Sequence, residues 1–385
     1  MDIAAHTPAT PGPQPCATGF PGPAVEGTPA LHPDARRGRA SFSNASGRYE
    51  RHQRVPADDG WNTIEENQRQ TRTQVFRDSS RSIIARNTSP DIPFDRSINP
   101  YRGCEHGCSY CFARPTHSYL GLSPGLDFES RLFAKPDAAA LLETALRNPR
   151  YECKPMAMGT NTDPYQPIEK DYQITRSVLE VLAKFKHPVS IVTKSALITR
   201  DVDILSELAA DNLVKVFVSV TSLDNRLSRK MEPRASAPKR RLEAIRTLSV
   251  AGVPTGVMFA PTIPGLNDHE MESVLTAARE AGAAQAGYIL LRLPLEVKSL
   301  FYEWLSNAAP ERASRVMTLI RSMRRGRDYD PNWSQRMIGT GPVAETLSKR
   351  FRLSVKRLGF ENRTAPLDTS KFCAPLARGG QMALF

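Results

Sequence analysis

The alternation of two kinds of segment after about residue 95 is the feature that most constrains the fold of this chain. Short β-rich apolar runs occupy residues 96–99, 156–159, 189–193, 214–220, 255–259 and 287–291. Amphipathic stretches that favour helices lie between them, at residues 137–147, 175–185, 202–210, 238–250 and 270–281. Strands that alternate with helices in this way predict a parallel sheet.

Polar residues after the runs distinguish between two parallel-sheet folds. A doubly wound sheet and a barrel both contain apolar strands, but a barrel brings the loops after successive strands to one rim. Here hydroxyl, amide and charged side chains follow the second, third and fourth runs. We therefore expect an α/β fold with a partial (β/α)6 barrel of the TIM type over residues 95–295.

The segments outside the barrel have weaker patterns. Residues 1–55 are rich in proline and glycine and lack periodic apolar residues, so we expect a disordered tail. Residues 56–94 are polar with a few apolar anchors, which favours an arm wrapped on the barrel. Residues 296–360 predict a helical extension, and residues 361–385 predict a polar tail.

The chain is strongly basic, with a formal net charge of +12. Such a charge attracts polyanions, which favours a nucleic acid as partner, although a basic protein kept soluble by its charge would have the same composition. The N-terminus lacks the basic and apolar regions of a signal peptide, and no apolar stretch has the length of a membrane span. We expect a cytoplasmic protein without a membrane partner.

Three of the six cysteines form a C-x3-C-x2-C loop, Cys104, Cys108 and Cys111. Thiolates at this spacing, in a chain with too few cysteines for a disulfide scaffold, indicate a metal centre in a reducing compartment. A structural zinc site needs four ligands, whereas three thiolates on an iron-sulfur cluster leave one iron open for a substrate. The alternative is a zinc site completed by His106 or His117.

The cysteine loop, with Tyr110 directly before its last cysteine, resembles the signature of the radical S-adenosylmethionine (SAM) superfamily. The resemblance implies that Cys104, Cys108 and Cys111 ligate a 4Fe–4S cluster whose fourth iron is chelated by SAM. Reductive cleavage of SAM then yields a 5'-deoxyadenosyl radical that abstracts hydrogen from the substrate. It also implies that Tyr110 packs near the adenine, and that an electron donor such as flavodoxin or ferredoxin is a partner.

Further cofactor contacts are expected in the loops after the next strands. The second run is followed by Gly159, Thr160, Asn161 and Asp163, where the superfamily binds the methionine amino group. Asp163 could instead cap a neighbouring backbone group within a proline-bracketed turn. Lys194 after the third run suits the methionine carboxylate, and Ser219 at the end of the fourth suits a ribose hydroxyl. The alternative for Lys194 is a solvated charge.

Arg292, after the sixth run, suits a phosphate or a salt bridge at the barrel rim.

The loop Cys-Glu-His-Gly-Cys-Ser-Tyr-Cys-Phe-Ala-Arg, together with Asn-Thr-Asp-Pro-Tyr and Thr-Lys-Ser, resembles the group of proteins related to spore photoproduct lyase. That relationship implies repair or modification of nucleic acid, DNA above RNA. One position departs from the lyase, which has a hydrogen-donating cysteine where this chain has Gly159 and Thr160. Cys153 precedes the strand, so we expect it at the opposite end of the barrel.

Two alternatives to a radical SAM enzyme that acts on DNA are open at this point. One is a non-enzymatic, basic nucleic-acid-binding protein with a structural zinc or a redox cluster, and the other is a radical SAM enzyme that acts on RNA or protein. The last five residues, from Gln381 to Phe385, resemble the peptide that docks on the bacterial sliding clamp, although Leu384 and Phe385 could instead fold back on the barrel. Cys16, Cys153 and Cys373 have no neighbours at ligand spacing and are expected to be small buried residues or free thiols.

Overall fold

A computed structural model describes residues 31, 33, 36–50, 71–361 and 365–375. Its main feature is a seven-stranded sheet with the strand order β10-β9-β8-β7-β6-β3-β2. The strands are β2 (Ile84–Arg86), β3 (Arg96–Ile98), β6 (Met156–Met158), β7 (Val189–Thr193), β8 (Val214–Ser219), β9 (Thr255–Thr262) and β10 (Gln285–Leu290). Each apolar run in the sequence therefore forms a strand.

The order of the strands identifies the sheet as a partial barrel. From β3 to β10 each strand of this sheet pairs in parallel with the next one along the chain, so every crossover moves in the same direction. A doubly wound sheet would reverse its direction once. The predicted partial (β/α)6 barrel is confirmed, and β2 adds an antiparallel strand at its first edge.

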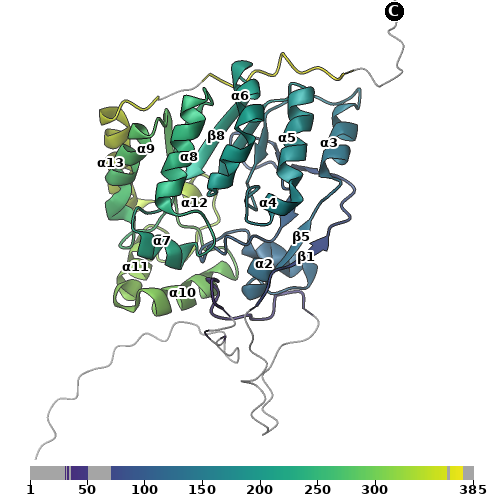
Figure 1. The fold of residues 1–385 in the computed structure, drawn as a ribbon. Coiled ribbons are helices and arrows are strands. Elements are labelled where there is room, and N and C mark those ends of the chain that lie inside the picture. The colour runs from purple at the N-terminus through teal and green to yellow at the C-terminus, as the bar shows by residue number, and fades with distance from the viewer. Residues whose placement is uncertain (1–30, 32, 34–35, 51–70, 362–364, 376–385) are drawn as a thin grey trace, which may run out of the picture.

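Helices connect these strands and cover one face of the sheet (Figure 1). The main ones are α3 (Ala138–Leu146), α5 (Ile174–Lys184), α6 (Val202–Ala210), α8 (Pro238–Val250) and α9 (Met271–Glu280). Shorter elements lie in the loops: η1 (Arg114–Leu120), α2 (Leu126–Ser130), α4 (Glu169–Tyr172), η2 (Ala196–Asp201), α7 (Asn225–Met231) and η3 (Asp268–Glu270).

Alternate residues of the strands face the helices and the barrel interior. In β8, Val214, Val216 and Val218 are fully buried in the core against the helices, whereas Lys215 and Phe217 are half-buried. The interior face is less buried because the barrel is not closed. This alternation decides which side chains after a strand point into the barrel.

The arm expected at residues 56–94 contributes strands to two sheets. β1 (Gln74–Arg77) pairs in parallel with β5 (Arg131–Ala134), which also pairs with β4 (Tyr101–Arg102). These three form a small sheet of their own, while β2 joins the barrel. Each of these strands has four residues or fewer, which is too short for a recognisable alternation in the sequence.

Residues 36–50 do not show the disorder expected for the N-terminal tail. Arg39, Ala40 and Ser41 are buried. The backbone N–H groups of Ala40 and Ser41 each donate to the carboxylate of Glu129 at 3.0 Å. Polar contacts hold this segment in place, so a search for periodic apolar residues could not detect it. We call residues 36–50 the N-terminal strap. Residues 1–30, with Cys16, lie outside the described residues.

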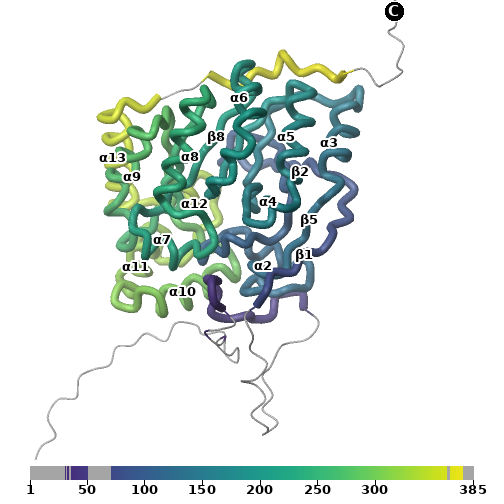
Figure 2. Tube along the Cα trace, in the orientation of Figure 1, coloured from purple at the N-terminus to yellow at the C-terminus, as the bar shows by residue number. Residues whose placement is uncertain are grey.

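The chain after β10 is mainly helical. It forms α10 (Val297–Ala308), α11 (Pro310–Ser322), α12 (Gln335–Ile338) and α13 (Gly341–Arg357). Residues 365–375 then run across the helices at the amino ends of the strands (Figure 2). There the side-chain amide of Asn212 donates to the carbonyl of Pro366 at 2.9 Å. The backbone N–H of Cys373 donates to the carbonyl of Phe185 at 3.1 Å. The expected clamp-docking peptide, Gln381 to Phe385, lies outside the described residues.

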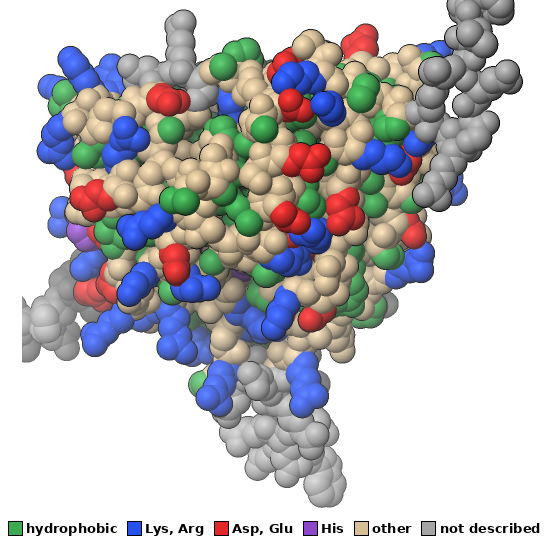
Figure 3. Space-filling view, turned by 45° about the horizontal axis from the view of Figure 1, so that its top comes forward, with side chains coloured by type: hydrophobic (Ala, Val, Ile, Leu, Met, Phe, Trp, Pro, Cys, Tyr) green, Lys and Arg blue, Asp and Glu red, His purple; other side chains and the backbone are tan. Residues whose placement is uncertain are grey.

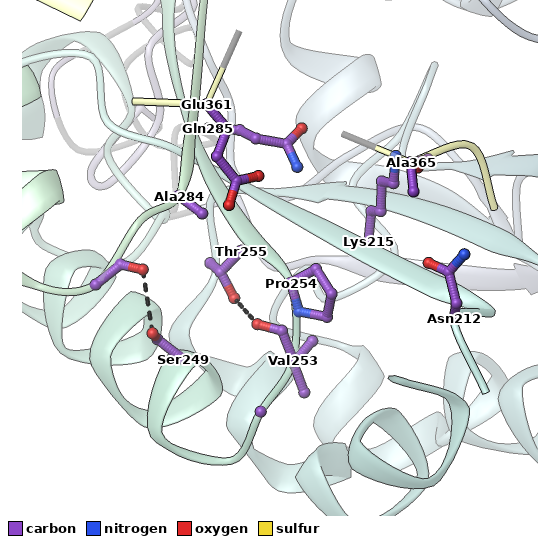
Figure 4. A pocket seen from close by; sticks show the side chains of 12 residues that line it. Asn212, Lys215, Ser249, Val253, Pro254, Thr255, Ala284, Gln285, Glu361 and Ala365 are labelled. Atoms are coloured by element: carbon purple, nitrogen blue, oxygen red, sulfur yellow. Dashed lines mark hydrogen bonds between the residues drawn. The ribbon is translucent and has the colours of Figure 1, made fainter. Parts of the chain in front are cut away.

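A pocket opens at the amino ends of β8, β9 and β10, where Asn212, Lys215, Thr255 and Glu361 line it (Figure 4). Barrel enzymes place their chemistry at the opposite, carboxyl ends of the strands. We therefore assign this pocket to the stabilising end of the barrel. Within the described residues, no helix combines the length and the apolar character needed to span a membrane.

Candidate functional site

The cysteine loop lies between β4 and η1 and turns sharply on two glycines. Gly103 and Gly107 have positive φ angles of 74° and 61°. A Cβ on Gly107 would lie 2.6 Å from a carboxylate oxygen of Glu129, so a larger residue cannot fit there. Cys104 N donates to the carbonyl of Phe128 at 3.0 Å, which fixes the start of the loop.

The three thiols are enclosed by the protein. Cys104 and Cys108 are buried and Cys111 is partly buried. Burial raises the pKa of the Cys104 thiol, and the nearby thiols of Cys108 and Cys111 raise it further. Ligation by a metal would remove this penalty, because metal ligands bind as thiolates.

Cations surround the cysteine loop, as an anionic cluster requires. Burial raises the pKa of the Cys108 thiol, while Lys194 and Arg241 act in the opposite direction. Burial also raises the pKa of the Cys111 thiol, against the effect of Arg114. Arg114 further donates to the carbonyl of Cys108 at 2.9 Å and thereby braces the loop. The residues present therefore fit a 4Fe–4S cluster held by three thiolates.

The histidines considered as a fourth zinc ligand are held elsewhere. His106 Nδ1 lies 3.3 Å from Oδ2 of Asp163. His117 Nε2 lies 2.9 Å from the carbonyl oxygen of Arg131, and its ring meets Phe128 edge-on. Across the described residues, no three His, Cys, Asp or Glu side chains converge as the ligands of one metal ion do. A cluster spreads its ligands over several iron atoms and does not need such convergence.

Asp163 ties the cysteine loop to the ends of two strands. Its Oδ1 accepts from Thr193 Oγ1 at 2.7 Å and from Tyr165 N at 2.9 Å, and its Oδ2 accepts from Lys194 N at 2.7 Å. Burial opposes ionisation, but His106 and these donors lower the pKa of Asp163 to about 2. Both oxygens serve protein groups, so Asp163 positions the loop and Lys194.

The rest of that loop lies at the carboxyl end of β6. Gly159 has a φ angle of 85°, and a Cβ there would collide with the carbonyl of Val192. Asn99 Oδ1 accepts from Thr160 Oγ1 at 3.4 Å and from Asn161 N at 3.2 Å. The structure thus gathers these predicted residues at one rim, where their contact with a cofactor remains a prediction.

Lys194 follows β7 and points into the barrel. Its Nζ lies 5.9 Å from the centre of the Tyr110 ring. The Lys194 ammonium makes no hydrogen bond or ion pair with any residue that the structure describes. Ser219 ends β8 on the same interior face, and its carbonyl accepts from Arg241 at 3.0 Å. A free ammonium beside buried thiols is suited to an anionic ligand.

Behind Tyr110 is a buried network that the sequence did not reveal. The hydroxyl of Tyr110 donates to Glu232, which also accepts from Thr221 Oγ1 at 2.6 Å and from the guanidinium of Arg241. Arg241 belongs to a basic cluster that looks like a solvated helix face in the sequence. It is 1% exposed and Glu232 2%. Only the tertiary fold pairs these two residues, so no local pattern could have found them.

Arg292 follows β10 on the other side of the cysteine loop. Its guanidinium lies 4.0 Å from the centre of the Phe112 ring, and it contacts no carboxylate within the described part of the chain. The salt bridge considered for Arg292 is therefore not formed with any residue of the described ranges. Cys153 precedes β6, and its thiol lies near Arg96 at the amino end of β3, far along the strands from the cysteine loop.

A comparison with family models identifies the family, and a comparison with curated proteins finds relatives by sequence. A family model described as the radical SAM superfamily matches residues 98–278, which include the three cysteines, Lys194 and Ser219. An uncharacterized protein of Mycobacterium tuberculosis is 36% identical over 287 residues, which cover 74% of this chain and 81% of that protein. The chain belongs to the radical SAM superfamily. A protein of Methanocaldococcus jannaschii is 30% identical over 173 residues, 45% of this chain and 62% of that protein.

Solved structures show a similar fold. Spore photoproduct lyase complexed with a dinucleoside spore photoproduct has a TM-score of 0.53 at 15% identity, over 74% of this chain and 80% of that one. A variant of that lyase has a TM-score of 0.51 at 17% identity over the same shares. The family implies a 4Fe–4S cluster and SAM, and the cysteine loop fits the cluster.

Proposed function

We propose that this protein is a radical SAM enzyme that repairs or modifies nucleic acid, DNA in preference to RNA. The observation that carries the proposal is the Lys194 ammonium inside the barrel, without a partner among the described residues, beside the buried or partly buried thiols of Cys104, Cys108 and Cys111. When bound, the cluster and SAM supply a 5'-deoxyadenosyl radical that takes hydrogen from a substrate. The protein's part is to bind, orient and exclude water.

The chain's own residues divide this work. Cys104, Cys108 and Cys111 hold the cluster, and Lys194 pairs with the methionine carboxylate. Asp163 fixes the backbone of Lys194 through a 2.7 Å hydrogen bond, and so sets where the ammonium lies.

Further contacts to the cofactor come from both sides of the barrel interior. Tyr110, held by Glu232, packs near the adenine. Ser219 serves a ribose hydroxyl, and Gly159 allows close approach of the backbone at the methionine end.

Charge supports a nucleic acid as the substrate. The chain carries a net charge of +12, and the Arg292 guanidinium after β10 has no carboxylate partner among the described residues. An arginine that stacks on Phe112 can bind a phosphate while the exposed ring contacts a base. Spore photoproduct lyase, which has a similar fold, was solved in complex with a dinucleoside spore photoproduct. Gly159 and Thr160 replace the lyase's cysteine, which argues against the same hydrogen-return step.

Release of 5'-deoxyadenosine tests the proposal. Anaerobically reconstituted, reduced protein is incubated with SAM and with intact DNA, ultraviolet-damaged DNA, RNA or no substrate. We expect more 5'-deoxyadenosine with one of the DNA substrates than without substrate. If RNA alone increases the release of 5'-deoxyadenosine, the substrate is RNA. Equal release of 5'-deoxyadenosine in all four incubations would contradict a nucleic-acid substrate.

A sliding clamp is proposed as a protein partner. The segment Gln381 to Phe385 resembles the clamp-docking peptide, in which Leu384 and Phe385 would be the buried anchors. Changing both to Ala should cost on the order of 2 kcal/mol per anchor, as at interface hot spots. Fluorescence anisotropy of a labelled C-terminal peptide with purified clamp measures this. Equal binding by the wild-type and Leu384→Ala/Phe385→Ala peptides would remove the clamp as a partner.

A further inference from the structure

Helix α7 separates the cysteine loop from solvent. On its inner side, Met231 is fully buried in the same cluster as Cys108 and Tyr110. The carbonyl of Met231 accepts from Ser109 N at 2.9 Å, which joins the helix to the middle of the cysteine loop. An α-helix is about 10 Å wide, so the outer surface of α7 lies one helix width from the cluster ligands.

The outer side of α7 is basic. Arg226, Arg229 and Lys230 are exposed. Neither Arg226 nor Arg229 forms a side-chain hydrogen bond or ion pair with a residue in the described ranges, and Lys230 donates to the carbonyl of Ala308 at 2.8 Å. Figure 1 shows α7 at the rim, beside α10 and α11, and Figure 3 shows Lys and Arg more frequent than Asp and Glu toward the lower edge of the molecule.

A hollow of about 300 Å³ adjoins this basic side, between α7, α10 and the N-terminal strap. Its lining includes Arg39, Arg229, Lys230, Phe42 and Trp304, and no acidic residue from the described segments. Arg39 is 8% exposed, and its Nε has no hydrogen-bond partner among the described residues. The other guanidinium nitrogens of Arg39 donate inside the protein, to the carbonyl of Glu129 and to Thr73 Oγ1. The accessible charge of the hollow therefore comes from the exposed Arg229 and Lys230, and it suits an acidic side chain of a partner.

The reaction itself requires a partner at such a surface. The cofactor and the substrate occupy the barrel interior, so a protein that delivers an electron must approach the cluster from outside. We propose that the outer face of α7 and the adjoining hollow dock a small acidic electron-transfer protein, whose carboxylates pair with the exposed cations of α7. This inference rests on the proposed function, since it requires a cluster on Cys104, Cys108 and Cys111.

The electron balance of the step is simple. One electron leaves the reduced donor and reduces the cluster from its 2+ to its 1+ state. The donor is oxidised by one electron, and no bond or proton changes place. The positive surface of α7 contributes by raising the rate of encounter with a negatively charged donor, an effect that salt weakens.

The test compares two reductants on the anaerobic, reconstituted full chain without substrate. Reduced flavodoxin, an acidic flavoprotein, and a photoreduced deazaflavin, a small molecule, each reduce the cluster while its absorbance and electron paramagnetic resonance signal are followed. We expect Arg226→Glu/Arg229→Glu to slow reduction by flavodoxin about tenfold at low salt and to leave reduction by deazaflavin unchanged. Binding of oxidised flavodoxin to the chain, measured by calorimetry, should weaken in parallel.

A matched control is Lys349→Glu/Arg352→Glu on α13, which makes the same charge change on an exposed face of another helix. It should behave as the wild type. Equal flavodoxin rates for the α7 variant and the wild type would overturn the proposal, as would equal slowing with both reductants. Weaker binding of an oligonucleotide with an unchanged flavodoxin rate would assign α7 to nucleic acid instead. Because no substrate is present, failure of the 5'-deoxyadenosine assay does not alter these outcomes.

Discussion

Two features set the position of Lys194: the alternation of side chains along β7 and the hydrogen bond from its backbone N–H to Asp163. The residue before it, Thr193, is buried and bonds Asp163, so Lys194 points to the interior and reaches Tyr110. Such a position could be inferred from the sequence, because period two is fixed by strand geometry. The sequence could not show that the Lys194 ammonium lacks a carboxylate partner within the described residues, because that depends on every neighbouring element.

Lys194→Ala should weaken SAM binding and leave the cluster in place. A hydrogen bond to a charged group contributes about 1.5–3 kcal/mol, so we expect a loss of about tenfold or more in affinity. Calorimetric titration of the reconstituted protein with SAM measures it, and iron content is checked in parallel. Lys154→Ala, at the amino end of the barrel, serves as control. Unchanged affinity for SAM in the Lys194 variant would show that the Lys194 ammonium is a solvated charge that does not contact SAM.

Cys104→Ala, Cys108→Ala and Cys111→Ala should each abolish cluster binding, because two thiolates would remain on a cluster that already lacks a fourth protein ligand. Iron, sulfide and zinc are measured after anaerobic purification. The exposed Cys373 provides the control, and Cys373→Ala should retain full iron. Full iron in any of the three variants would refute the assignment, and stoichiometric zinc in the wild type would favour the structural-zinc alternative.

At the scale of elements, strand β8 and helix α8 illustrate what could be predicted. Their patterns of apolar residues are long enough to be recognised, and both form as expected. β1, β4 and β5 are short, and their pairing depends on residues far apart in the chain. The buried ion pair between Arg241 of α8 and Glu232, next to α7, likewise depends on tertiary contacts.

That ion pair leads to a prediction about stability. Glu232→Gln leaves Arg241 without a counter-charge in the core, which should lower the free energy of unfolding by about 3 kcal/mol. Urea unfolding measures it. Glu243→Gln, which breaks the exposed pair with Arg240, should cost less than about 1 kcal/mol. If both variants lose the same free energy of unfolding, the buried pair of Glu232 and Arg241 contributes no more to stability than the exposed pair does.

The same variant has a defined pH dependence. Burial opposes ionisation of Glu232, but Arg241 and Lys194 outweigh it and lower the pKa to about 2, from an ordinary 4.5. A lowered folded-state pKa stabilises the protein fully above the unfolded pKa, and this contribution is lost as the pH falls through the folded pKa. The stability difference between wild type and Glu232→Gln should therefore be constant above about pH 5 and narrow toward pH 2.

At the scale of the whole molecule, the N-terminal strap and the cysteine loop are joined through one carboxylate. Glu129 is fully buried and accepts from Ala40 N, from Ser41 N and Oγ, and from Arg114. Arg114 in turn braces the carbonyl of Cys108. A segment that reads as disordered in the sequence thus closes the outer side of the cluster site.

Glu129→Gln should loosen the strap and the cysteine loop together. A neutral amide donates as well as accepts, so it cannot satisfy the three donor groups of the strap and the Arg114 guanidinium at once. We expect faster tryptic cleavage at Arg36, Arg37 or Arg48 and faster loss of iron in air than in the wild type. Glu143→Gln, which breaks a half-exposed pair with Arg147 at the end of α3, is the control. If cleavage accelerates while iron is retained at the wild-type rate, the strap closes the fold without protecting the cluster.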